Sequence, residues 1–489
     1  MSNSPSGREW LRAIARRAMK QRGFEPDFPP AVLSETDAAT QPAERPASPP
    51  ATDMRELPWC SIDNDDSRDL DQLTVAEELK DGSLRLLVAV ADVDAVVPRG
   101  SAIDARARTN TTSVYTPAQV FPMLPERLST DLTSLNESED RLAVVVALET
   151  RQDGSVTGAS LFRALVRNQA KLAYDSVAAW LDGKAEAPAA VAASRELERQ
   201  LRLQDGVASA MKERREQRGA LALATTESKA VFDGDLLADM RPDEANRSKE
   251  MIQDFMIAAN TATASFLEQH GFPSLRRVLR QPDRWDRIQS LARDLGETLP
   301  DAPDARALQA FLLKRRAQDP ERFPDLSLSV IKLLGSGEYG VQEPGHTPDG
   351  HFGLAVKGYA HSTAPNRRYP DLVAQRLVKA ALAGAACPYA TDELHELARH
   401  CTDQEDDAVK IERQVVKSAA AMLLAPRKGE RFDGIVTGAS SKGTWVRVFR
   451  PPVEGRVVRG EGGLDVGERV SVRLVDVNVE RGFIDFARE

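Results

Sequence analysis

The chain has 489 residues, of which 42% are hydrophobic and 28% charged, as is typical of a globular protein with more than one domain. Its 65 basic and 74 acidic residues give a net charge of −9, so any contact with nucleic acid must come from local basic surfaces. Three widely spaced cysteines argue against a disulfide framework or a zinc site, and no apolar run is long enough to span a membrane, so we expect a cytoplasmic protein.

A basic helix is predicted near the start of the chain, over residues 8–22. Apolar residues such as Leu11 and Ile14 recur there at helical spacing among six basic residues, and Gly23 is a suitable stop. Because so short a helix is marginal alone, we favour docking of its apolar stripe on the main body over a free arm that faces nucleic acid. The proline-rich residues 29–57 predict a partly extended linker.

Residues 61–72 read Ser-Ile-Asp-Asn-Asp-Asp-Ser-Arg-Asp-Leu-Asp-Gln and concentrate five carboxylates within nine positions. In an extended chain Asp69 and Asp71 lie on one face, and a turn after Asp63 would bring that carboxylate beside them. Carboxylates held so close raise one another's pKa unless a cation neutralises them. Hard oxygen ligands without nearby His or Cys suit Mg²⁺ or Mn²⁺ better than zinc. From these residues alone, a solvated acidic turn remains an alternative.

Strand and helix patterns alternate through the rest of the chain. Expected elements are a buried strand over 84–97, a hairpin of 143–149 and 155–166 that turns at Asp153-Gly154, and helices over 184–217, 251–270 and 284–320. Short strands bounded by glycine follow at 432–437, 443–449, 456–458, 469–477 and 482–487. These last strands predict a five-stranded OB barrel.

Two stretches carry a resemblance to a known family. The acidic motif Ser61-Ile62-Asp63 with Asp69-Leu70-Asp71, and the box Tyr359-Ala360-His361-Ser362-Thr363-Ala364-Pro365-Asn366-Arg367-Arg368-Tyr369-Pro370-Asp371, resemble the signatures of the ribonuclease II/R (RNB) exoribonucleases. The resemblance implies an α+β fold with an RNB-type catalytic domain and an S1-like OB barrel. The domains would be a basic helical segment at 1–28, a linker at 29–57, the catalytic domain at 58–428 and the RNA-binding barrel at 429–489.

This resemblance implies a Mg²⁺-dependent 3′-to-5′ exoribonuclease, with Mn²⁺ as an alternative ion. Such an enzyme hydrolyses single-stranded RNA to nucleoside 5′-monophosphates by two-metal catalysis. The family's four metal-binding positions fall on Asp63, Asp69, Asp71 and Gln72, with Asp71 the most critical of them. Arg367 occupies the position that grips the scissile phosphate, where a planar guanidinium matches phosphate oxygens. We expect a monomer with no membrane partner.

The same resemblance implies a set of contacts to RNA. They fall on Tyr115, Tyr174, Arg367, Arg368, Glu412 and Trp445. Tyr115 would stack on the 3′-terminal base, an interaction that tolerates any sequence. Glu412 would lie near the 3′ end, and Trp445 or Phe432 could stack bases on the barrel, although either aromatic could equally belong to the barrel core.

Four departures from the family pattern bear on activity. Gln72 offers a neutral carbonyl where relatives carry a carboxylate, so one ion should bind less tightly. Leu223 stands near the position of an aromatic that closes the base stack in relatives, and Gln253 replaces an acid near the ribose. The fewer than 60 residues before the acidic motif leave no room for the two cold-shock-type barrels that relatives usually carry there. These departures support an alternative, a catalytically weakened homologue that acts as an RNA-binding regulatory protein.

A third hypothesis takes Asp69-Leu70-Asp71 as the nucleophile motif of a dehalogenase-type phosphatase. That chemistry requires a continuous apolar strand directly before Asp69. Five polar residues, 64–68, stand there instead, so this hypothesis receives little weight.

Overall fold

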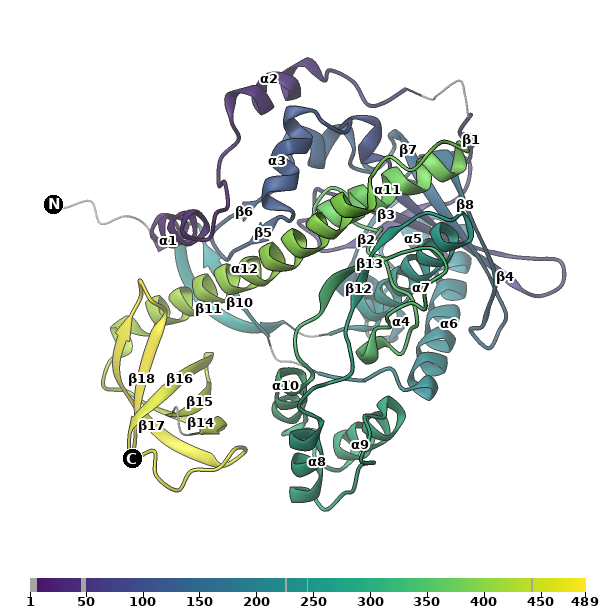
Figure 1. Ribbon diagram of the computed structural model, residues 1–489. Coiled ribbons are helices and arrows are strands. Elements are labelled where there is room, and N and C mark those ends of the chain that lie inside the picture. The colour runs from purple at the N-terminus through teal and green to yellow at the C-terminus, as the bar shows by residue number, and fades with distance from the viewer. Residues whose placement is uncertain (1–6, 45–49, 225–226, 244, 441–442) are drawn as a thin grey trace.

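The structure is a computed structural model that describes residues 7–44, 50–224, 227–243, 245–440 and 443–489. A seven-stranded sheet in the order β1-β8-β7-β4-β3-β2-β9 lies at the upper right of Figure 1. Its strands are β1 (Thr52–Asp53), β2 (Cys60–Asp63), β3 (Gln72–Glu78), β4 (Leu84–Ala91), β7 (Asp140–Thr150), β8 (Val156–Arg167) and β9 (Ala170–Ala173). The predicted hairpin is confirmed as β7 and β8. The buried strand predicted over 84–97 is confirmed for residues 84–91, as β4, but a short 3-10 helix at Val93–Ala95 replaces its predicted end.

The remaining strands form smaller units. They are β5 (Val114–Tyr115) with β6 (Val120–Phe121), β10 (Glu227–Asp233) with β11 (Leu236–Asp243), β12 (Ser274–Val278) with β13 (Glu338–Gln342), and the barrel strands β14 (Arg431–Ser440), β15 (Gly443–Phe449), β16 (Pro452–Arg459), β17 (Arg469–Asn478) and β18 (Phe483–Arg488). The last five close a barrel in the order β14-β15-β16-β18-β17, which confirms the predicted OB-type unit. The hairpin β10–β11 is a finding that the sequence patterns did not predict.

Helices cover the sheet and connect it to the barrel. They are α1 (Gly7–Gln21), α2 (Pro30–Ala38), α3 (Ala102–Asn110), α4 (Tyr174–Leu181), α5 (Ala189–Ala193), α6 (Arg195–Arg218), α7 (Arg247–Gln269), α8 (Trp285–Asp294), α9 (Ala305–Gln318), α10 (Phe323–Leu334), α11 (Tyr369–Leu382) and α12 (Thr391–Leu424). The predicted helices over 184–217, 251–270 and 284–320 are confirmed as α5–α6, α7 and α8–α9. In the part of the chain that the structure describes, no helix is both long and apolar enough to cross a membrane.

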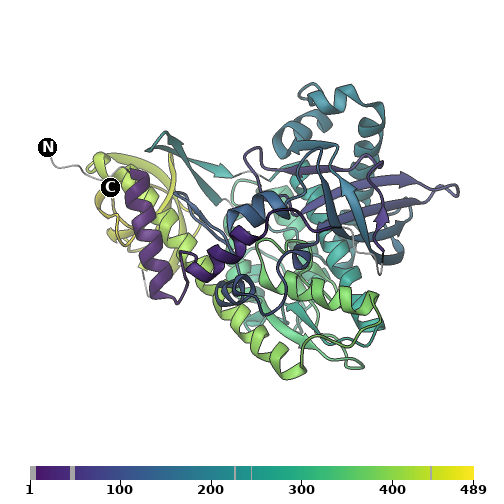
Figure 2. The same cartoon turned by 90° about the horizontal axis from the view of Figure 1, so that it is seen from above.

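The N-terminal helix docks as predicted. Helix α1 buries Leu11, Ile14 and Met19 in a hydrophobic cluster that it shares with α12 and the barrel. Figure 2 shows α1, in purple, lying beside these two elements. Part of the predicted linker is helical instead of extended, because Pro30 occupies the first turn of α2, where its missing N–H is not needed, and Val32 is buried. Residues 45–49 of the predicted linker lie outside the described residues.

The turn between β7 and β8 is pressed against helix α6. Gly154 has a φ of +75°, and a Cβ added there would overlap the backbone of Ala210 and Met211. We therefore expect Gly154→Ala to lower the free energy of unfolding by at least about 2 kcal/mol, from left-handed strain and overpacking together. Gly82→Ala is the matched control, since Gly82 has a φ of +78° with no atom within 4 Å of an added Cβ. Equal falls in melting temperature in the two variants would contradict a close contact between Gly154 and the backbone of α6.

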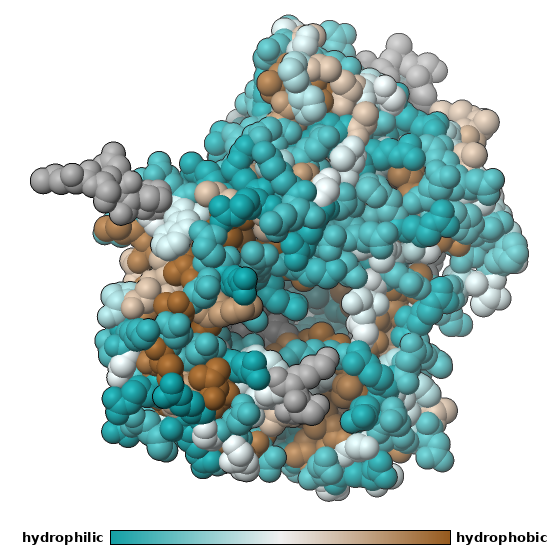
Figure 3. Space-filling view, turned by 60° about the vertical axis from the view of Figure 1, so that its left-hand side comes forward, coloured by the Kyte–Doolittle hydropathy of each residue, from teal (hydrophilic) through white to brown (hydrophobic). Residues whose placement is uncertain are grey.

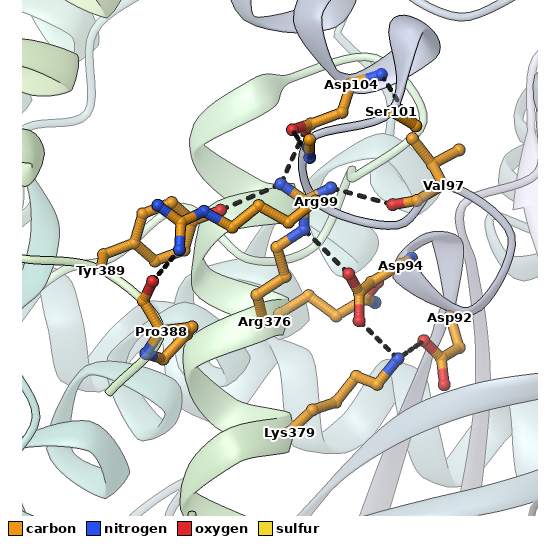
Figure 4. A network of polar contacts seen from close by, with 12 residues as sticks. Asp92, Asp94, Val97, Arg99, Ser101, Asp104, Arg376, Lys379, Pro388 and Tyr389 are labelled. Atoms are coloured by element: carbon orange, nitrogen blue, oxygen red, sulfur yellow. Dashed lines mark hydrogen bonds and ion pairs between the residues drawn. The ribbon is translucent and has the colours of Figure 1, made fainter. Parts of the chain in front are cut away.

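A buried ionic network holds helix α11 to the end of the sheet, as Figure 4 shows. Arg376 is 4% exposed, and each of its three guanidinium nitrogens donates at least one hydrogen bond. Its acceptors, at 2.7–2.9 Å, are Asp94 Oδ1, Asp104 Oδ1, Tyr389 Oη and Val97 O. Lys379, one turn further along α11, lies 2.8 Å from Asp92 and 2.7 Å from Asp94. Because the first turn of α11 is the end of the box at 359–371, this network also fixes the position of that box.

The barrel faces helix α10 across a pair of hollows. Arg447 of β15 crosses between the two units and pairs with the buried Asp325 of α10 at 3.0 Å. One hollow, of about 720 Å³, is lined largely by arginines of the barrel and of the loop before α10. Figure 3, which brings the barrel side forward, shows the surface hollowed in its lower half, with hydrophobic side chains gathered around the hollow and a hydrophilic surface above it.

Candidate active site

The acidic motif spans the connection between two sheet strands. Asp63 ends β2, and its Oδ1 accepts hydrogen bonds from Asn64 N at 2.7 Å and Ser67 Oγ at 2.9 Å. These bonds close the turn that the sequence predicts and return the chain toward β3. Leu70 is buried, and its N donates to Ser134 Oγ at 3.0 Å, which anchors the segment between Asp69 and Asp71.

The box at 359–371 meets this motif through Asp71. The backbone N of Asn366 donates to Asp71 Oδ1 at 3.1 Å, and Arg367 Nε lies 3.1 Å from Asp71 Oδ2. The carbonyl of Arg367 accepts from Ser113 N at 2.9 Å, so the box also runs beside the segment that carries Tyr115. The fold thus brings Asp71, Arg367 and Tyr115 together from three separate parts of the sequence.

Arg368 is placed differently from its neighbour. Its guanidinium forms a bidentate pair with the buried Asp371, at 2.9 and 2.7 Å. Asp371 Oδ1 also accepts from Ala364 N at 2.8 Å, so this pair shapes the loop that presents Arg367. The role of Arg368 in binding RNA stays a prediction, and its guanidinium is engaged by Asp371.

Two tyrosines flank the carboxylates. Tyr115 is 40% exposed as a whole residue, and its backbone N donates to Glu412 Oε1 at 2.7 Å, which ties the predicted stacking residue to α12. Burial raises the pKa of the Tyr115 hydroxyl to about 12, against the opposing effect of Arg367. Tyr174 begins α4 directly after β9, whose pairing with β2 sets Ala173 opposite Asp63. Burial also raises the pKa of Tyr174, and the charge of Asp63 adds to the shift.

The three carboxylates share one cationic side chain. Asp71 is 1% exposed, and burial raises its pKa to about 7, with Arg367 opposing the shift and Asp69 adding to it. Burial likewise raises the pKa of Asp69, with Asp63 adding to the shift. The nearby carboxylates outweigh the effect of burial on Arg367 and raise the pKa of its guanidinium. A site with more carboxylates than cations would be stabilised by a bound cation.

The carboxylate oxygens at this site suit a hard divalent ion, although their side chains do not converge on one point. Within the described ranges, no three His, Cys, Asp or Glu side chains lie together in a metal-binding arrangement. Asp71 Oδ2 is nevertheless buried and makes no hydrogen bond, although Arg367 Nε lies 3.1 Å away, and the charge of Asp69 is close enough to raise the pKa of Asp71. These features fit Mg²⁺ or Mn²⁺. Gln72, the first residue of β3, is 8% exposed and brings no charge.

A cleft of about 620 Å³ opens onto this site. The acidic motif contributes Asp66, Arg68 and Asp69 to it, and the β5–β6 segment contributes Tyr115. Strand β10 of the hairpin β10–β11 and Arg8 of α1 also line the cleft, and the sequence did not assign either of them to the site. No motif in those two segments marks them as parts of a site, because only the long-range packing brings them there.

The other predicted positions lie away from this cleft. Trp445 is half-buried and lines a separate hollow of about 570 Å³ between the barrel, α10 and α12, whereas Phe432 packs in the barrel core against Phe486, with ring centroids 6.1 Å apart. Leu223 and Gln253, two departures from the family pattern, line one hollow of about 390 Å³. Burial raises the pKa of the neighbouring Asp254 to about 6, and this carboxylate is engaged by Arg215.

Comparison with known proteins assigns both domains. Residues 51–384 match the RNB domain, and residues 430–489 match the RNase II-type exonuclease C-terminal S1 domain. Ribonuclease R of Escherichia coli strain K12 is 30% identical over 497 aligned positions, which cover 94% of this chain and 60% of that protein. Ribonuclease R of Thermotoga maritima is 30% identical, over 88% of this chain and 61% of that protein. The chain therefore spans about 60% of the length of these curated relatives.

Solved structures share the fold. RNase R of Mycoplasma genitalium in complex with ribose-methylated single-stranded RNA superimposes with a TM-score of 0.88 at 22% identity, over 98% of this chain and 78% of that one. Yeast Ssd1, described as a pseudonuclease, superimposes with a TM-score of 0.71 at 17% identity, over 91% of this chain and 55% of that one.

The phosphatase hypothesis is wrong, because β2 ends at Asp63 and no strand leads into Asp69. On the match of 51–384 to the RNB domain, this chain belongs to the RNB family of ribonucleases.

Proposed function

We propose that this chain is a divalent-metal-dependent 3′-to-5′ exoribonuclease that hydrolyses single-stranded RNA to nucleoside 5′-monophosphates. The observation that carries the proposal is the pairing of Asp71 with Arg367 beside the exposed ring of Tyr115. This arrangement joins a carboxylate site for cations to a phosphate-binding guanidinium and to a stacking surface for a base. The relatives named Ribonuclease R support the same substrate class.

Each residue has a defined task in this reaction. Tyr115 stacks on the 3′-terminal base, while Glu412 holds the backbone of Tyr115 in place. Arg367 turns from Asp71 to the scissile phosphate, where its planar fork of donors positions the oxygens and stabilises the charge that develops on them. Asp63, Asp69 and Asp71 would hold the ions. The chemistry that a bound pair of Mg²⁺ ions supplies is Lewis-acid activation of water and stabilisation of the leaving oxygen.

The first test is degradation of 5′-labelled single-stranded RNA on a denaturing gel. We expect a ladder that shortens from the 3′ end in Mg²⁺ or Mn²⁺, complete arrest with excess EDTA, and recovery when either ion is restored, since three carboxylates without a cation repel the phosphate. A 3′-labelled copy of the same RNA is the control for direction. It should release its label as a mononucleotide from the start, and release of longer labelled fragments would contradict an exonuclease.

Gln72 supports a second candidate, a weakened homologue that binds RNA without degrading it. Its neutral amide leaves the site one carboxylate short of the family pattern, and the pseudonuclease Ssd1 demonstrates that this fold persists in a protein without nuclease activity. Shortening in Mn²⁺ alone would indicate a weakened metal site. RNA binding without shortening in either ion would favour the regulatory protein over the enzyme.

A further inference from the structure

The hairpin β10–β11 forms the wall of the cleft that faces the acidic motif. Ser228, Lys229 and Ala230 of β10 line the same cleft of about 620 Å³ as Asp69 and Tyr115. None of these hairpin residues belongs to a family signature identified in the sequence. The hairpin therefore has a place at the site but no role in the reaction as described above.

Helix α1 braces the tip of this hairpin. The backbone N of Arg8 donates to Asp235 O at 3.2 Å, and its Nη2 donates to Gly234 O at 3.1 Å. The Arg8 guanidinium also lies 4.3 Å from the ring centroid of Phe232, a distance suited to a cation–π contact. The N-terminal helix thus fixes the turn of the hairpin through three contacts from one residue.

The open end of the hairpin is held as well. Ser228 Oγ donates to Pro452 O of the barrel at 2.7 Å. Met240 of β11 is buried in the hydrophobic cluster that contains α12 and the barrel core. Both strands contact α12, and β11 also contacts β16 of the barrel. Figure 1 shows the two strands, in teal, passing behind α12. Held at both ends, the hairpin presents a preformed surface to the cleft.

That surface carries an unfavourable pair of like charges. The antiparallel register sets Lys229 directly opposite Arg241, so both side chains leave the same face of the hairpin. Arg241 is 3.2 Å from Asp239, whereas exposed Lys229 makes no hydrogen bond or ion pair with any residue that the structure describes. Like charges at directly opposed positions destabilise a sheet unless an anion lies between them. Among the described residues, Lys229 is thus a cation without a partner in the wall of a cleft.

We propose that the hairpin β10–β11 is the guide for the incoming RNA backbone, with Lys229 bound to a phosphate upstream of the nucleotide that stacks on Tyr115. This inference rests on the proposed function. It gives a role to Lys229, a lysine that lines the same cleft as Asp69 and Tyr115 and has no partner among the described residues. A lysine acts on a phosphate as a point charge, so the contact positions RNA without reading its sequence.

The test measures binding separately from hydrolysis. In an Asp71→Asn background and in EDTA, fluorescence anisotropy of a labelled single-stranded RNA is recorded across a series of salt concentrations with Lys229→Met, Lys229→Arg and Lys80→Met. Lys80 is the matched control, because it is an exposed lysine in the β3–β4 turn and does not line the cleft. We expect Lys229→Met to raise Kd about fivefold and to reduce the slope of log K against log salt by about 0.7, the loss of one phosphate contact. Lys229→Arg and Lys80→Met should keep the affinity and slope of the background protein.

Two results would overturn the inference in distinguishable ways. If the background protein binds RNA and Lys229→Met changes Kd less than twofold with the same salt slope, the guide is wrong while the proposed function stands. If the background protein does not bind RNA in any salt, both the guide and the proposed function fail. A change of Kd without a change of slope would assign Lys229 a structural role and would also overturn the proposed contact.

Discussion

We expect Asp71→Asn to lower the rate of RNA shortening by about 10³-fold or more and to leave the protein folded. Asp71 is the residue on which the two halves of the candidate site converge, since its carboxylate faces both Asn366 N and Arg367. An amide of the same shape can still accept from Asn366 N, but it can neither hold a divalent ion nor balance the guanidinium. Losing one such group costs several kcal/mol of transition-state stabilisation.

The same substitution should leave the melting temperature of the metal-free protein unchanged or raise it. The pKa of Asp71 is about 7 in the folded protein, above the unfolded value of roughly 4. The free energy of unfolding of the metal-free protein therefore falls as pH rises between these values. In EDTA at pH 8, Asp71→Asn should therefore melt at the same temperature as the parent or higher. Asp65→Asn, at an exposed position of the same motif, is the control and should alter neither rate nor melting temperature. A large fall in melting temperature for Asp71→Asn would contradict the assignment of its role to chemistry.

Arg376→Met should destabilise the protein by about 3–5 kcal/mol, because it leaves the buried Asp104 without its guanidinium partner and Asp94 with Lys379 alone. A methionine fills the space but donates no hydrogen bond, so the loss is electrostatic. Thermal unfolding followed by circular dichroism measures the effect. Because α11 carries the end of the box, RNA shortening should fall together with stability.

Arg99→Met is the matched control in the same network (Figure 4). Arg99 is 42% exposed, pairs with Glu393 at 2.7 Å and lies 4.3 Å from the ring centroid of Tyr389. Exposed pairs of this kind are worth about 1 kcal/mol or less. Equal melting temperatures for the two variants would contradict the prediction that the buried Arg376 contributes more stability than the exposed Arg99.

The sequence predicted the elements whose pattern is local. The alternation of Val470, Val472 and Leu474 with polar residues marks a barrel strand, and the turn at Gly154 marks a hairpin, because each depends only on neighbours in the chain. The metal-binding positions and Arg367 were predicted from short motifs. The contact between Asp71 and Arg367 is the result of folding, and proximity alone does not establish their roles.

The sequence does not predict features that depend on packing between distant segments. Lys229 carries no local signal, and its position over the cleft follows from contacts of the hairpin with Arg8 and Pro452. Helix α2 was missed because Pro30 was interpreted as a linker residue, although proline at the first turn is compatible with a helix. The network around Arg376 joins two segments that lack any motif identifying them as partners.

Helix α12 has a consequence for how the chain folds during synthesis. This 34-residue helix, about 51 Å long, carries the surface that buries Leu11 and Ile14 of α1. The ribosome reaches the start of α12 370 residues after it completes α1. At 5–20 residues per second this interval is about 20–75 s, during which the apolar stripe of α1 has no partner. Helix α1 thus reaches its native position only long after it is made, once α12 has followed it.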